Sequence, residues 1–193
     1  GCGHKFGGPK GVGFLGLSSN SHGFCSQLGG GQESGRRGGT ENVPSILSMG
    51  AALEFADEHL SDMDGQSIYR DEFERALGST LPELECIGKT ATRVSNTSFL
   101  IMPRFENIRW VRKLDIKGFQ VSTGSACSTG DTASSPILNA LGYSAEFGRR
   151  TIRISAGPST SQSDWEGLAE AFRDVWSDLQ KSDSSSESEV ISI

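Results

Sequence analysis

Two stretches of the chain repeat apolar residues at steps of three and four, which is the spacing of one helical face. The first stretch has Pro44 at a first-turn position, and its apolar residues are Ile46, Met49, Leu53, Ala56 and Leu60. In the second, Ser163 and Glu166 fit a capping box, and the apolar residues are Trp165, Leu168, Phe172, Val175 and Leu179. Further helices are predicted over 66–77 and 106–117, each followed by a glycine, and a short one over 135–142.

Between these helices lie short apolar runs that predict strands. They are residues 12–17, 94–102, 119–122 and 151–155. Residues 18–42 read as a long loop, which in a compact domain is usually functional or disordered. Helices and strands that alternate in this way predict an α/β or α+β layered fold.

Composition narrows the classes of function. The 193 residues carry only 18 Lys and Arg and a net charge of −6, so neither nucleic acid nor an anionic membrane is expected as a partner. No apolar run is long enough for a membrane span, and no signal segment opens the chain. The four cysteines lack the spacing of a zinc site, and His22 and His59 have no ligand partners, so no metal is expected. A reduced, cytoplasmic location is expected.

Two segments carry candidate chemistry. Lys5 follows His4 in a glycine-rich turn, where a desolvated amine could act as a Schiff-base nucleophile; a solvated surface lysine is the plainer interpretation. Cys127 lies in a loop of small polar residues between a strand and a helix, where an exposed thiol is partly ionised; a buried structural cysteine is the alternative. A G-x-G-x-x-G at 11–16 lies within a predicted strand and does not fit a dinucleotide fingerprint.

Four blocks together resemble one family. They are HKFGGPKG at 4–11, GGGQESGRRGGTEN at 29–42, SAC at 125–127 and IRIS at 152–155. In order and spacing they resemble cysteine desulfurases, pyridoxal-phosphate enzymes of the class V aminotransferase group, over about residues 1–180. The resemblance implies an α/β fold, a fragment of a fold type I pyridoxal-phosphate-dependent transferase. Residues 1–60 would be the end of the large cofactor domain with a connecting helix, and 61–180 the small α+β domain with a mobile cysteine loop at 123–134. The serine-rich acidic tail, 181–193, is expected to be disordered.

The resemblance also implies a role for each matching residue. Lys5 would carry pyridoxal 5′-phosphate, and His4 and Cys2 would contact it. Thr40 would reach the phosphate of a partner subunit's cofactor, which implies a homodimer. Arg153 would bind the carboxylate of L-cysteine. Cys127 would take the sulfur as a persulfide and pass it to an acceptor or iron–sulfur scaffold protein, leaving L-alanine.

Two departures keep alternatives open. Cys2 stands where the family usually has serine, and a thiol is a weaker hydrogen-bond donor. The resemblance covers only the family's C-terminal half, so the chain alone is expected to bind the cofactor weakly or not at all. The alternatives are another class V enzyme, such as a selenocysteine lyase, and a non-catalytic fragment that lacks the cofactor cradle.

Overall fold

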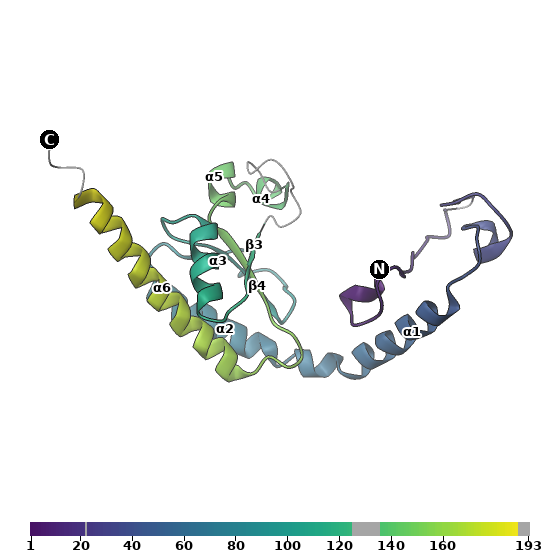
Figure 1. The fold of residues 1–193 in the computed structure, drawn as a ribbon, viewed down its shortest axis with the longest axis horizontal. Helices are drawn as coiled ribbons and strands as arrows, with labels where there is room; N and C mark the ends of the chain where they lie inside the picture. Colours follow the sequence, from purple (N-terminus) through teal and green to yellow (C-terminus); the bar gives the residue numbers. More distant parts are fainter. Residues whose placement is uncertain (22, 125–135, 189–193) are drawn as a thin grey trace. The chain divides into compact units, whose positions relative to one another are not determined.

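A computed structural model of the chain describes residues 1–21, 23–124 and 136–188. The chain divides into two compact units, Gly1–Ser61 and Asp62–Ile193. This division falls one residue from the predicted domain boundary at 60. Each unit is described by itself below, with the element labels of Figure 1.

The first unit has little regular structure before its one long helix. Short 3₁₀ turns occupy Gly3–Lys5 (η1) and Gln32–Gly35 (η2), and the helix α1 spans Val43–Glu58 (Figure 1). Proline at the start of α1 and the Asn42 side chain, which accepts the Ser45 N–H at 3.3 Å, define where it begins. The helix is therefore predicted correctly, although none of its residues is buried within the described chain.

The strand predicted over 12–17 is wrong. Only Gly13 pairs, in a single antiparallel bridge with Cys2, and Phe14 and Leu15 are 52% and 65% exposed. A strand needs a neighbour that satisfies its backbone along its length. The described residues supply such a neighbour at one position only.

The second unit is built on a four-stranded antiparallel sheet. Its strands are β1 (Glu85–Cys86), β2 (Thr97–Ile101), β3 (Ser122–Thr123) and β4 (Thr151–Ser155), in the order β1-β2-β4-β3. The register places Phe99 opposite Arg153 on one side of β4 and Ser122 opposite Arg153 on the other. Strand β4 has the predicted bounds, whereas β2 is shorter than predicted and β3 lies later in the chain.

The main core lies between three helices and one face of this sheet. They are α2 (Gln66–Gly78), α3 (Asn107–Ile116) and α6 (Gln162–Ser188). Their apolar residues form one cluster with Leu100, Ile152 and Ile154 of the sheet. The predicted stripe of α6 is confirmed, since Trp165, Leu168, Phe172, Val175 and Leu179 are all buried. A smaller cluster joins Ile87 and Ile101 to Leu138 of α4 (Pro136–Ala140), with Phe147 of α5 (Ala145–Gly148) packed beside it.

The start of α6 differs from the predicted capping box. The helix begins at Gln162, and the box is formed by Ser161 and Asp164 instead of Ser163 and Glu166. The Asp164 carboxylate accepts the Ser161 N–H at 2.8 Å, and the Asp164 N–H donates to the Ser161 hydroxyl at 3.3 Å. The Ser161 hydroxyl also donates to the Asp164 carboxylate at 2.7 Å, and this bond, followed by the bond from the Ser161 N–H, lowers the pKa of Asp164. Both pairs have the required spacing, so the sequence pattern alone did not separate them.

The far end of α6 also corrects the predicted tail. Residues 181–188 are helical and not disordered; residues 189–193 lie outside the described part. Asp183 pairs with Arg104 and Arg109 from the segment around α3, and the Ser182 and Ser184 hydroxyls donate to backbone carbonyls four residues earlier. Such serines satisfy their own hydroxyl groups within the helix, and the pairs of Asp183 hold the helix beyond the apolar stripe.

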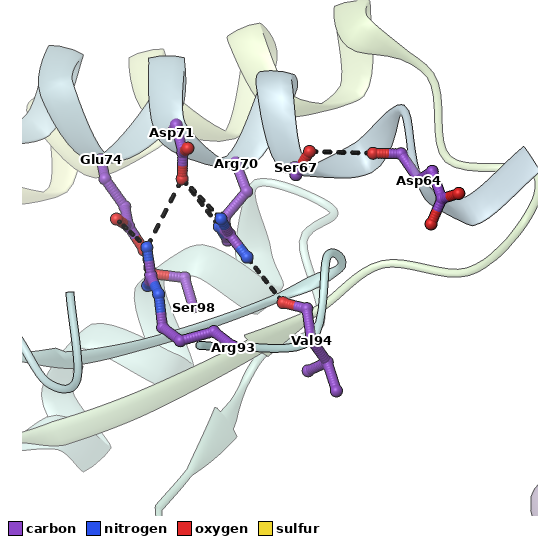
Figure 2. Close-up of polar contacts among 8 residues, drawn as sticks. All are labelled: Asp64, Ser67, Arg70, Asp71, Glu74, Arg93, Val94 and Ser98. Carbon is purple, nitrogen blue, oxygen red and sulfur yellow. Dashed lines mark hydrogen bonds and ion pairs between the residues drawn. The ribbon is translucent and has the colours of Figure 1, made fainter. Parts of the chain in front are cut away.

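An ion pair on a buried carboxylate joins α2 to the segment that precedes β2 (Figure 2). The Glu74 side chain is 1% exposed and accepts two guanidinium bonds from Arg93, at 2.7 and 3.1 Å. The Ser98 hydroxyl donates to the same carboxylate at 2.7 Å. Because Ser98 belongs to β2, these bonds fix the position of that strand against α2. The hydrogen bonds that Arg93 donates to the Glu74 carboxylate also raise the pKa of Arg93.

Replacing Glu74 with alanine is expected to destabilise the second unit by about 3–5 kcal/mol, the usual cost of removing one partner of a buried pair. The loss follows because the buried Ser98 hydroxyl would lose its acceptor and Arg93, whose side chain is 15% exposed, would keep only its 3.4 Å pair with Asp71. Chemical unfolding of Glu74→Ala measures the change. Asp174→Ala is the matched control, since that carboxylate is 66% exposed and its pair with the partly exposed Lys117 should contribute about 1 kcal/mol or less. Equal effects of the two variants would contradict the argument.

Candidate functional site

A closed backbone turn presents Lys5. The Gly3 N–H donates to Val12 O at 2.9 Å, the Gly8 N–H donates to Gly3 O at 2.9 Å, and the Lys5 N–H donates to Cys2 O at 3.0 Å. Gly3 is buried at the centre, where an added Cβ would lie 3.0 Å from Pro9 O. The turn thus uses its backbone internally and leaves the Lys5 side chain exposed.

The structure brings three of the predicted site residues together on this turn. Cys2, His4 and Lys5 are all exposed and lie within four positions of one another. Among the described residues, no hydrogen bond or ion pair occupies the Lys5 amine. An amine, an imidazole and a thiol are therefore exposed on one turn.

Thr40 follows a second closed loop in the same unit. The Gly38 N–H donates to Gln27 O at 2.9 Å, and the Gly39 N–H donates to the Gln32 side chain at 3.3 Å. Gly29 and Gly38 cross closely, since a Cβ on Gly38 would lie 2.6 Å from the Gly29 Cα. Thr40 itself is exposed. Gln32 was not singled out in the sequence, although its side chain shapes the approach to Thr40.

Arg153 belongs to the second unit. It lies on the central strand β4, between Phe99 of β2 and Ser122 of β3, and its side chain is exposed while its neighbours Ile152 and Ile154 are buried. Among the described residues, no carboxylate pairs with it. An unpaired guanidinium on a rigid strand suits a carboxylate ligand. No single element holds both Arg153 and Lys5, because they belong to different units.

Cys127 lies outside the described residues, as do Ser125 and Ala126. The described chain resumes at Pro136, the first residue of α4. Of the other cysteines, Cys2 and Cys25 are exposed thiols and Cys86 is half-buried in β1. Burial, and secondarily the Glu74 carboxylate, raises the pKa of Cys86 to about 11. Cys86 is therefore protonated at neutral pH and is a poor nucleophile.

A hollow of about 720 Å³ lies elsewhere in the first unit. Apolar side chains and two guanidinium groups line it, among them Phe14, Phe24, Arg36, Arg37 and Ile46. Its lining includes none of the predicted site residues, although it includes Gly13, which pairs with Cys2. No helix in the described part of the chain is long and apolar enough to cross a membrane.

Comparisons with known proteins point to one family. Cysteine desulfurase 2 of Trichormus variabilis is 36% identical over 84% of this chain and 41% of its own length. A solved NifS-like protein superposes with a TM-score of 0.76 at 26% identity, over 91% of this chain and 45% of that one. A structure of SspA in complex with cysteine gives a TM-score of 0.55 at 30% identity, over 82% and 43%. The chain thus spans less than half the length of these relatives.

The predicted α/β class and the resemblance to cysteine desulfurases are confirmed by these matches. The aminotransferase class-V family matches residues 2–168, most of the chain. The chain belongs to the aminotransferase class-V family.

Proposed function

We propose that this chain is part of a cysteine desulfurase that uses pyridoxal 5′-phosphate to convert L-cysteine to L-alanine. The observation that carries the proposal is the open, unpaired Lys5 amine beside His4 and Cys2. Its support from outside the site is the similarity to proteins named cysteine desulfurases.

The chemistry of the donor set fits this cofactor. Pyridoxal phosphate has an aldehyde, which needs an amine, and a phosphate, which needs hydrogen-bond donors. Lys5 would hold the aldehyde, His4 and Cys2 would contact the phosphate, and Thr40 would reach a phosphate on a partner subunit. When bound, the cofactor supplies an electron sink that stabilises negative charge on the carbon chain of an amino acid.

The residues of this chain would supply the remaining steps. Lys5, as a free amine, would move the proton at the substrate Cα. Arg153 would bind the substrate carboxylate through two parallel N–H···O bonds. The Cys127 thiolate would attack the substrate sulfur, so that an S–S bond forms as the substrate Cβ–S bond breaks. The products are alanine, which takes up the proton that the Cys127 thiol releases, and a persulfide on Cys127.

The partners follow from the same proposal. The persulfide on Cys127 would pass to an acceptor thiol or to an iron–sulfur scaffold protein, and the Thr40 contact would require a homodimer. We also propose a cytoplasmic location, because a persulfide-forming thiol needs a reducing compartment. The described thiols Cys2, Cys25 and Cys86 are unpaired, which agrees with such a location.

In the test, pyridoxal phosphate and L-cysteine are added to the native protein that contains this sequence. Alanine and sulfane sulfur are expected in equal amounts, and peptide mass mapping should find an added sulfur atom on Cys127 but not on Cys86. L-selenocysteine and cysteine sulfinate are offered in parallel. Turnover of selenocysteine without turnover of cysteine would replace the proposal with a selenocysteine lyase. Absence of any turnover would favour a non-catalytic fragment.

A further inference from the structure

Arg153 has an aromatic neighbour that the mechanism above does not use. Phe99 of β2 lies directly opposite Arg153 of β4, and Ser122 of β3 lies opposite it on the other side. Residues directly opposite in an antiparallel pair point to the same face of the sheet. The face that exposes Arg153 therefore also carries Phe99, away from the main core. Next along this face, the Thr97 and Ser155 hydroxyls lie 3.2 Å apart.

Phe99 belongs to the smaller apolar cluster on that face. It is half-buried and packs against the cluster formed by Ile87, Ile101 and Leu138. Leu138 is 1% exposed and belongs to α4, the first element after residue 135. Phe99, which lies opposite Arg153, thus also packs against the cluster that contains Leu138 of α4.

Gly124, the last described residue before position 125, lies against the ring of Phe99. A Cβ on Gly124 would lie 2.5 Å from Phe99 Cε2, 2.8 Å from Phe99 Cζ and 2.7 Å from Thr151 Oγ1. Gly124 is not among the glycines with a positive φ. The absence of a side chain there is therefore required by space and not by the backbone conformation.

Thr151 cannot easily give way to an added methyl group. Its hydroxyl donates to Gly148 O at 3.0 Å, and its own carbonyl accepts the Asn107 side chain at 3.0 Å. A methyl group at residue 124 would therefore displace either the Phe99 ring or the backbone at 124. Only the ring can be made smaller without breaking these hydrogen bonds.

We propose that Phe99 is a positioning residue for the desulfuration reaction. Its ring fixes where the chain leaves β3 at Gly124, and it occupies the sheet position opposite Arg153. This inference rests on the proposed function, because only that function makes the sequence after Gly124 a carrier of the reacting thiol. Phe99 acts through its neighbours and touches neither the substrate nor the cofactor in this role.

The test compares Gly124→Ala, Phe99→Leu and the double variant in the native protein with pyridoxal phosphate. Gly124→Ala should lower kcat for alanine formation about tenfold, with the KM for cysteine within about twofold, because a displacement of about 1 Å alters the attack but not carboxylate binding. Phe99→Leu in the same chain should recover at least about threefold of this loss by making room for the methyl group. Gly157→Ala is the control, since a Cβ there would meet nothing within 4 Å.

A second readout does not depend on turnover. The rate at which iodoacetamide alkylates Cys127, followed by peptide mass, should change about threefold in Gly124→Ala and return toward the wild-type rate in the double variant. If the wild-type protein forms no alanine, the proposed function fails; if it forms alanine but the two substitutions show no coupling, only the inference about Phe99 fails. Double-variant effects equal to the product of the single effects in both readouts would overturn it. Parallel losses of kcat, cysteine binding and stability in Gly124→Ala would also overturn it, because they indicate a structural role only.

Discussion

Replacing Lys5 with alanine is expected to abolish both the covalent attachment of pyridoxal phosphate and the formation of alanine from cysteine in the native protein. The loss of proton transfer alone corresponds to about 10²–10⁴-fold in rate, and the loss of the tether adds to it. The Lys5 backbone is held by its bond to Cys2 O, and the side chain is exposed. The substitution therefore removes an amine without removing a packing contact.

Borohydride reduction followed by peptide mass mapping measures the attachment. The wild-type protein should carry the reduced pyridoxyl group on the peptide that contains Lys5. Lys10→Ala is the matched control, because Lys10 is a second exposed lysine in the same glycine-rich segment. A pyridoxyl group on Lys10, or its retention in the Lys5 variant, would refute the role given to Lys5.

Replacing Cys127 with serine should leave cofactor attachment intact and reduce sulfur transfer to the background of the assay. A serine hydroxyl is almost fully protonated at neutral pH, whereas a thiol with a pKa of about 8.5 is partly ionised. Persulfide and sulfide released from L-cysteine measure the loss.

Two other cysteines serve as comparisons for Cys127. Cys25→Ser removes an exposed thiol and Cys86→Ala removes one that is protonated at neutral pH, so both variants should keep their activity. Sulfide release that survives Cys127→Ser but is lost in Cys25→Ser would transfer the role to Cys25.

Local patterns predicted the helices well, because a helix is specified by neighbours three and four residues apart. The stripe from Trp165 to Leu179 is buried as its spacing predicts. The errors arose where a partner distant in sequence decides the outcome. Residues 12–17 have the composition of a strand but find one pairing position, and α6 extends past 181 because Asp183 meets Arg104 and Arg109.

The residues of the candidate site also fall into two groups, those placed by near neighbours in the sequence and those placed by distant ones. Lys5 and His4 lie in a turn closed by residues within ten positions, so their placement could be read from the sequence. The pairing of Phe99 with Arg153 joins residues 54 positions apart (153 − 99), and the contact of Gly124 with both Phe99 and Thr151 depends on the sheet register. No local pattern contains the register of distant strands. Sequence reasoning therefore proposed Arg153 as a site residue without its neighbours in the sheet.

Exposed ion pairs join α3 to α6. Their residue numbers rise along α3 as they fall along α6, because the two helices run in opposite directions. Lys117 pairs with Asp174 at 2.8 Å, Lys113 with Asp178 at 4.0 Å and Arg109 with Asp183 at 3.6 Å. As far as Leu179, α6 is held by buried side chains, which salt does not screen, while beyond Leu179 the pairs of Asp183 with the exposed Arg104 and Arg109 hold it. Concentrated salt should therefore fray the helix from its C-terminal end inward and leave the half nearest Trp165 in place.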